Sequence, residues 1–220
     1  MVDFKKILTG QTDKNDKEYY WSLIIEPGWI QAGVWRVFEE KAQIISLSLA
    51  TPWETDEDLL TSADTVLSAA TQNFPDHVKG PSKTVFGVPS SWVSEGQIRQ
   101  EYLGKIKIIC SELSLEPVGF VVLPEAISHI LKSEEGSPLN AVLLGIYKDT
   151  IEISVFKLGS LSGNTLVSRS VSIVDDVYEG MTRFAGIDAL PSRLILYNAK
   201  EKELEEARQT LINVNWEDFE

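Results

Sequence analysis

Residues 140–156 constrain the fold of this chain more than any other stretch of its sequence. They read Asn-Ala-Val-Leu-Leu-Gly-Ile-Tyr-Lys-Asp-Thr-Ile-Glu-Ile-Ser-Val-Phe. An apolar run at 141–144 precedes a short polar turn at 147–150, and apolar residues then alternate with polar ones at Ile151, Ile153 and Val155. An apolar run, a polar turn and a period of two together predict a β-hairpin.

This hairpin resembles the second phosphate loop of the actin, Hsp70 and FtsA superfamily. That loop has an Asp and an apolar residue, then three glycines, two threonines and an Asp, and glycine N–H groups approach the phosphate while the first carboxylate holds a hydrated Mg²⁺. Thr150 and the acidic Glu152 match the pattern. Gly145 stands at the metal-coordinating Asp, and the three glycine positions hold Tyr147, Lys148 and Asp149. The resemblance therefore implies a phosphate-binding hairpin that has lost its phosphate-binding residues.

Residues 23–37 resemble the first phosphate loop of the same superfamily. That loop consists of an apolar strand, an Asp-apolar-Gly-Thr/Ser turn and a returning strand. Here Glu26 stands at the Asp, Gly28 is kept, and Trp29 replaces the small hydroxyl residue. Pro27 removes one backbone donor from a turn in which donors would bind phosphate.

The third nucleotide motif of the superfamily, a glycine-rich adenosine segment after a late strand, corresponds to residues 194–200. These read Leu-Ile-Leu-Tyr-Asn-Ala-Lys and contain no glycine. Only residues 186–192 separate the preceding predicted helix from this strand, which is too short for the adenine-side subdomain of the family. The resemblance thus implies a non-catalytic relative, and no catalytic residue is predicted.

The predicted elements follow the same order in both halves of the chain. In the first half, strands are predicted at 19–26, 30–38 and 42–50, then a helix that starts with Thr55 and Asp58 as a capping box. A strand at 84–88, a helix at 95–113, a strand at 118–123 and a short helix with Pro124 in its first turn follow. The second half has strands near 140–146, 150–157 and 165–173, a helix at 175–185, a strand at 193–197 and a helix at 200–212.

Both halves thus have the order βββαβα, which is what the resemblance implies. The expected fold is α/β, with two ribonuclease-H-like lobes in a minimal actin-like arrangement that lacks most of the extra subdomains. Residues 111–131 are similar to the corresponding segment of the bacterial pilus-assembly protein PilM and the cell-division protein FtsA. We expect a flexible tail at 1–17, lobe I at 18–137 and lobe II at 138–220.

Composition excludes several classes of function. The chain has 220 residues, 43% of them hydrophobic, and no apolar run long enough to insert into a membrane. Its formal net charge of −13 makes nucleic acid a poor partner, because each contact would begin with repulsion. Basic or neutral protein surfaces are the expected partners. Cys110 is the single cysteine, which excludes an internal disulfide and fits a reducing, cytoplasmic compartment.

The acidic residues Glu26, Asp149 and Glu152 allow two interpretations. They form either a residual metal site or solvated strand ends in a very acidic chain, and the second interpretation is favoured. No metal site is therefore predicted. If nucleotide binding is retained, the residues expected to bind the nucleotide are Glu26, Gly28, Thr150 and Glu152.

Six tryptophans in 220 residues raise the question of a protein-binding surface. Trp29 falls at a predicted turn and Trp53 at a strand exit, where burial is not assured. Exposed aromatic side chains suit protein recognition, so Trp29, Trp53 and Tyr147 are the predicted partner-binding residues. The alternative, equally open, is that the tryptophans fill the space that a nucleotide occupies in the family.

The resemblance and the lost motifs together predict a PilM/FtsA-like pseudo-ATPase domain that binds a protein partner as a cytoplasmic scaffold, without a cofactor. PilM-like relatives act at the cytoplasmic face of the inner membrane with a membrane-anchored partner, and we expect a similar pilus, secretion or division assembly here. Since the chain stops at Glu220 directly after a predicted helix, we expect a longer protein that continues into a membrane segment. Two alternatives stay open: a divergent ATPase that binds Mg·ATP between its lobes, and a structural homodimer built on an exposed sheet edge.

Overall fold

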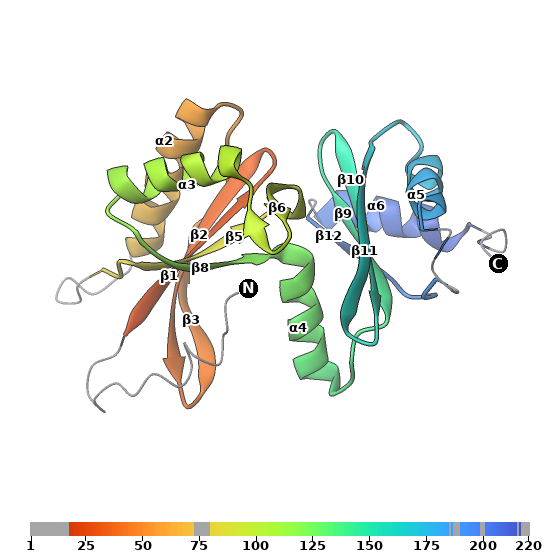
Figure 1. The fold of residues 1–220 in the computed structure, drawn as a ribbon, viewed down its shortest axis with the longest axis horizontal. Helices are drawn as coiled ribbons and strands as arrows, with labels where there is room; N and C mark the ends of the chain where they lie inside the picture. The colour runs from red at the N-terminus through yellow and green to blue at the C-terminus, as the bar shows by residue number, and fades with distance from the viewer. Residues whose placement is uncertain are drawn as a thin grey trace. The chain divides into compact units, whose positions relative to one another are not determined.

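The computed structural model describes residues 18–72, 80–184, 186, 190–198, 201–214 and 216. The chain forms two compact units, residues 1–123 and 124–220, each with its own sheet and core (Figure 1). The predicted tail at 1–17 lies outside the described residues. The sequence predicts the lobe boundary at 137, whereas the units divide where helix α4 (Leu123–Glu135) begins. The end of α4 is tied to the second unit, because the Glu135 carboxylate accepts from both terminal nitrogens of Arg193 at 2.7 and 2.8 Å.

The sheet of the first unit has the strand order β3-β2-β1-β5-β8. Its first three strands form an antiparallel meander, and the last two run parallel to β1. This order is the one expected of a ribonuclease-H-like lobe. The strands are β1 (Tyr19–Glu26), β2 (Trp29–Phe38), β3 (Lys41–Leu47), β5 (Lys83–Val88) and β8 (Glu116–Val122), with a short β4 (Thr51–Pro52) paired to β2.

Helices α2 (Asp56–Thr71) and α3 (Gln100–Glu112) cover one face of this sheet (Figure 1). The predicted capping box at the start of α2 is confirmed, because Thr55 Oγ1 accepts the Asp58 N–H at 3.2 Å and the Asp58 carboxylate accepts the Thr55 N–H at 3.1 Å. Apolar side chains of the helices and strands meet in a core that includes Leu23, Ile25, Ile30, Leu59, Val66 and Ile109.

Helix α3 begins later than the sequence predicts. The predicted helix spans 95–113, whereas α3 starts at Gln100. The preceding residues form a single 3-10 turn (Ser90–Trp92) and a small hairpin of β6 (Val93–Ser94) and β7 (Gln97–Ile98). Glu95 and Gly96 at the tip of this hairpin have φ angles of +53° and +74°, which a right-handed helix does not allow.

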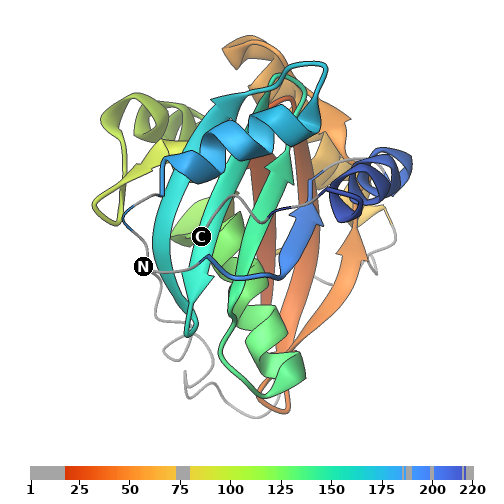
Figure 2. The ribbon, with the colours of Figure 1, turned by 90° about the vertical axis from the view of Figure 1, so that its right-hand side faces the viewer.

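The second unit repeats the meander on a smaller scale. Its sheet has the order β11-β10-β9-β12, in which the first three strands are antiparallel and β12 runs parallel to β9. Figure 2 shows helix α5 lying across the face of this sheet. The elements are β9 (Ala141–Ile146), β10 (Thr150–Lys157), β11 (Ser160–Ser168), α5 (Ile173–Thr182), β12 (Leu194–Tyr197) and α6 (Glu201–Ile212).

Two short connections determine the arrangement of this unit, the β10–β11 turn and the segment between α5 and β12. The sequence predicts the third strand at 165–173, but β11 already begins at Ser160, because Leu158 and Gly159 reverse the chain in two residues with φ angles of +51° and +78°. Only residues 183–193 separate α5 from β12, which is too short for a further subdomain. The prediction of a minimal α/β fold with a βββαβα second lobe is therefore confirmed.

None of the described helices is long and apolar enough to cross a membrane.

Candidate functional site

The predicted site residues lie at two turns, one in each unit. Glu26, Gly28 and Trp29 form the turn between β1 and β2. Tyr147 lies in the turn between β9 and β10, and Thr150 and Glu152 lie at the start of β10. Each turn directly follows the first strand of its unit.

The Glu152 side chain is the centre of a buried polar network in the second unit. Its carboxylate accepts hydrogen bonds from Tyr147 Oη at 3.1 Å, Tyr197 Oη at 2.9 Å and Asn164 Nδ2 at 2.9 Å. Asn164, which lies opposite Ser154 on the neighbouring strand, also donates to Ser154 Oγ at 2.7 Å. Glu152 is 3% exposed, so these donors replace the water that a carboxylate would otherwise bind.

Gly145 makes this network possible. It pairs with Glu152 on one side and with Tyr197 on the other, so the three residues lie in a row across β10, β9 and β12. A Cβ atom added at Gly145 would lie 2.6 Å from Cζ and Oη of Tyr197, which means that the tyrosine ring rests on the glycine backbone. Because the Tyr197 hydroxyl is bonded to Glu152, the ring cannot move aside without breaking that hydrogen bond.

The turn above the network is closed by its own backbone and by an arginine. The Tyr147 N–H donates to the Thr150 carbonyl at 2.9 Å, and the Asp149 carbonyl accepts the Arg169 N–H at 2.9 Å. The Arg169 guanidinium donates to the Tyr147 carbonyl at 2.9 Å and pairs with Glu203 of α6 at 2.6 Å. Arg169, which directly follows β11, therefore links the turn to helix α6.

This arrangement does not fit a bound Mg·nucleotide. An Asp at position 145, where the superfamily has its metal ligand, would overlap the Tyr197 ring. The carboxylate of Glu152 already accepts three hydrogen bonds, whereas Mg²⁺ requires free carboxylate oxygens or waters held by them. Within the described ranges, no group of three or more His, Cys, Asp and Glu side chains is placed to hold a metal ion.

The turn of the first unit is stabilised by Trp53, a residue outside the β1–β2 hairpin. Gly28 has a φ of +85°, as the third residue of a type II turn requires. The Trp53 indole N–H donates to the carbonyls of Glu26 at 2.9 Å and Trp29 at 3.1 Å. The Trp53 backbone N–H donates to the carbonyl of Gly28 at 3.3 Å. Trp53, the residue that follows β4, thus binds three of the four carbonyls of the turn at 26–29.

The structure corrects one interpretation of the acidic residues and places the predicted aromatic residues. Glu26 is fully buried and Glu152 nearly so, whereas the sequence favours solvated carboxylates at both positions; only Asp149 is exposed. Tyr147 is 5% exposed, with its hydroxyl directed to Glu152. Trp29 and Trp53 are half-buried, and Trp53 packs against the core of the first unit.

Sequence reasoning missed three members of the network: Tyr197, Asn164 and Ser154. Tyr197 ends an apolar strand, and nothing in its local sequence indicates a polar partner. One signal was available, because a glycine inside a buried strand often marks the close approach of another group, and Gly145 is such a glycine.

Cys110 is the single cysteine of the chain. It is half-buried and packs against the core of the first unit. Burial raises the pKa of its thiol, which disfavours the reactive thiolate form.

Comparisons with known proteins bear on the fold. No protein-family model matches the sequence, and no curated protein matches it. The ethanolamine utilization protein EutJ from Carboxydothermus hydrogenoformans matches with a TM-score of 0.56 at 14% identity, over 94% of this chain and 87% of that one. A Bacteroides thetaiotaomicron protein with an actin-like ATPase fold and unknown function matches with a TM-score of 0.52 at 13% identity, over 96% and 92% of the two chains.

Two further matches have different roles. An exopolyphosphatase from Cytophaga hutchinsonii has a TM-score of 0.52 at 8% identity, over 91% of this chain and 74% of that one. The PilM–PilN type IV pilus biogenesis complex has a TM-score of 0.50 at 13% identity, over 88% of this chain and 69% of that one. Identities this low concern the fold and not the activity. The matches with TM-scores above 0.5 show that this chain has the actin-like ATPase fold.

Proposed function

We propose that this chain is a non-catalytic domain of actin-like fold, a pseudo-ATPase that acts as a protein-binding scaffold. The observation that carries the proposal is the Tyr197 ring on Gly145, with its hydroxyl on Glu152. In an ATPase of this fold, the corresponding position would have to offer a carboxylate to Mg²⁺ and free N–H groups to phosphate. Here the chain's own side chains occupy that position.

The turn sequences support the same proposal. Tyr147, Lys148 and Asp149 stand where glycines would let phosphate approach, and Asp149 adds a negative charge that repels it. The carbonyls of the other turn are bound by Trp53. Other residues of the same chain thus stabilise each turn, and neither turn needs a ligand to order it.

The inferred partner is a protein with a basic or neutral surface, because a net charge of −13 repels nucleic acid. The likeness to a complex of type IV pilus biogenesis favours a component of an assembly of that kind. We place this domain on the cytoplasmic side of the inner membrane as part of the same proposal. A single, half-buried cysteine with a raised thiol pKa is compatible with that reducing compartment.

A second candidate function is a divergent ATPase. The exopolyphosphatase match favours it, since an enzyme has the same fold. It would have to bind Mg·ATP through Glu26, Gly28, Thr150 and Glu152, of which Glu152 already accepts three hydrogen bonds.

The thermal midpoint of unfolding with and without millimolar Mg·ATP distinguishes the two functions. A ligand at one hundred times its Kd stabilises the folded state by about 2.7 kcal/mol, which shifts the midpoint by several degrees. The scaffold proposal expects no shift and no change in tryptophan fluorescence. A shift that Glu152→Gln abolishes would replace it with the ATPase.

A further inference from the structure

Strand β3 is an edge strand with unusual exposure of apolar side chains. It pairs with β2 on one side, and no described strand pairs with its other side. Ile44 is 64% exposed and Leu47 is 59% exposed. Ile45 within the strand and Phe38 and Leu49 beyond its ends are also exposed. An exposed, apolar sheet edge is a template on which another extended chain can pair.

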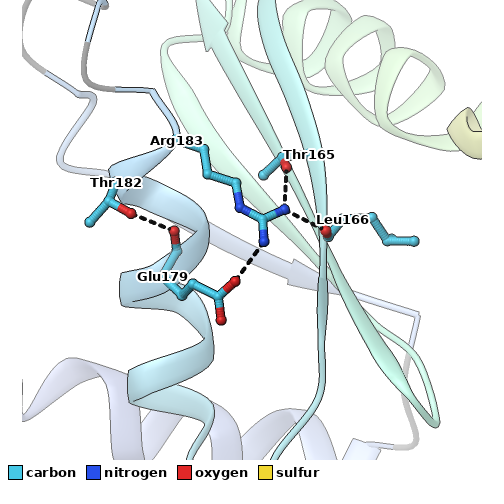
Figure 3. Close-up of polar contacts among 5 residues, drawn as sticks. All are labelled: Thr165, Leu166, Glu179, Thr182 and Arg183. Carbon is cyan, nitrogen blue, oxygen red and sulfur yellow. Dashed lines mark hydrogen bonds and ion pairs between the residues drawn. The ribbon is translucent and has the colours of Figure 1, made fainter.

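The corresponding edge of the second unit, β11, is protected by contrast. Arg183, at the end of α5, donates to the Leu166 carbonyl at 2.9 Å and to Thr165 Oγ1 at 3.2 Å, while its other nitrogen pairs with Glu179 at 2.5 Å (Figure 3). A charged side chain thus occupies a backbone acceptor of that strand, a usual defence of an edge.

No such clamp is found on β3 within the part of the chain that the structure describes. Gln43 accepts hydrogen bonds from Arg36 through its side chain, which leaves the backbone of β3 unclamped. A bulge at Ile45 is its only irregularity, because the pairing with β2 skips that residue. Residues 41–44 therefore keep a regular edge, and Ile44 lies at its end.

Charge on this edge is distributed unevenly. Residues 41–53 include Lys41 and no Asp or Glu, in a chain with 33 acidic residues. Glu39 and Glu40 form the turn directly before β3, and both are exposed. The edge is thus an apolar strip with one lysine, Lys41, and two carboxylates, those of Glu39 and Glu40, at one end.

We propose that the outer edge of β3 is the docking site for an extended segment of a partner protein. The segment pairs with residues 41–44 as a further strand, is apolar at alternate positions, and has a Lys or Arg beside the Glu39–Glu40 turn. This inference rests on the proposed scaffold function and specifies how the partner is bound.

A basic partner fits this edge better than a second copy of the chain does. Two copies with a net charge of −13 each repel one another. If two β3 strands paired antiparallel about Ile44, each glutamate turn would face residues 48 and 49 of the other copy instead of its Lys41. A foreign segment with a Lys or Arg supplies the positive charge that this pairing of two copies lacks.

Selection from a library of random 12-residue peptides tests the proposal. The full chain is the target, and Ile44→Lys is the counter-selection target, since its exposed position lets it change the edge without disturbing the core. We expect peptides with alternating apolar residues and a terminal Lys or Arg. Their affinity should fall about tenfold or more with Ile44→Lys, because the new lysine repels the peptide and removes an apolar contact.

Two variants complete the test. Replacing Glu39 and Glu40 by Gln should weaken binding about threefold to tenfold at low salt and have little effect at high salt, because the interaction with the turn is electrostatic. Leu166→Lys on β11 is the matched control and should leave affinity unchanged.

Three results would overturn the docking site. In the first, the selection yields no peptides whose binding depends on Ile44. In the second, Leu166→Lys lowers peptide affinity as much as Ile44→Lys does. In the third, sedimentation shows a dimer that Ile44→Lys dissociates, which would assign the edge to a second copy. The Mg·ATP experiment tests the scaffold function separately. If Mg·ATP does not stabilise the chain and the selection yields no peptides, the docking site on β3 is contradicted, but the scaffold function is not.

Discussion

The two turns that resemble phosphate loops both have carbonyls bound by a residue outside their hairpin, but only the second also contacts a buried side-chain network. The turn between β1 and β2 is held through its backbone carbonyls by Trp53, a residue outside the hairpin. The turn between β9 and β10 is held through side chains beneath it, where Tyr147 meets the Glu152 network. The first turn needs glycine for its backbone conformation, while the second hairpin needs it for space.

This difference shows that corresponding turns in the two units are stabilised by different contacts. In the first unit, Pro27 restricts the turn and Trp53 binds its carbonyls. In the second, the ring of Tyr197 from another strand occupies the space that a larger side chain at Gly145 would need. Substitutions at the two glycines should therefore have unequal effects, and the predictions below measure that inequality.

The largest effect is expected at Gly145. Gly145→Asp places a carboxylate on the Tyr197 ring and beside Glu152, which should destabilise the fold by about 4 kcal/mol or prevent folding. Gly145→Ala tests the steric part alone and should cost about 2 kcal/mol in urea unfolding. Gly28→Ala, the matched substitution, meets no atom within 4 Å and should cost about 1 kcal/mol through its positive φ alone.

A double-mutant cycle identifies the cause at Gly145. Removing the ring with Tyr197→Ala should abolish most of the cost of Gly145→Ala, because the added methyl group then has room. Equal costs of Gly145→Ala in the presence and absence of the ring would contradict the packing account.

The next effect concerns the buried carboxylate. Glu152→Ala leaves the hydroxyls of Tyr147 and Tyr197 and the Asn164 amide without their acceptor, which should cost about 3 kcal/mol. Tyr197→Phe removes one donor and should cost about 1.5 kcal/mol. Chemical denaturation measures both. If Glu152→Ala proved neutral, the network would not stabilise this unit.

Trp53→Phe should have a smaller effect on the first turn. It keeps most of the aromatic packing and removes the indole donor to the carbonyls of Glu26 and Trp29, at a cost of about 1 kcal/mol. Amide hydrogen exchange should speed up in the turn between β1 and β2, and exchange in β9 and β10 should stay as it was. Faster exchange in both hairpins would mean that the two turns are coupled.

The smallest effect is a gain in stability. Glu39 and Glu40 have φ angles of +50° and +62°, in a two-residue hairpin turn that favours Asn-Gly. Glu40→Gly should raise the free energy of unfolding by about 1 kcal/mol, because glycine adopts this conformation without strain. Glu57→Gly, in the first turn of α2, should destabilise instead. A destabilising Glu40→Gly would mean that the turn is not strained.

Local patterns in the sequence predicted most elements of the fold. Apolar alternation placed β1, β2, β9 and β10, and the capping box at Thr55 placed the start of α2. The predicted start of α3 and the predicted bounds of β11 differ from the structure, because each depends on a tight turn whose residues, Glu95 and Leu158, rarely adopt positive φ. Such turns are decided by the pairing of the flanking strands.

The features of the candidate site can also be separated into those that the local sequence determines and those that depend on the pairing of strands. The sequence by itself determined that the hairpin at 140–156 has Tyr147, Lys148 and Asp149 at the three glycine positions of the phosphate loop that it resembles and Gly145 at the Asp position, because residue identity requires no structure. The tertiary structure alone decided what replaced them, since Tyr197 reaches Glu152 across 45 positions of sequence through the parallel pairing of β12 with β9. It also decided that Glu26 and Glu152 are buried, because burial depends on neighbours from other strands and not on the local pattern.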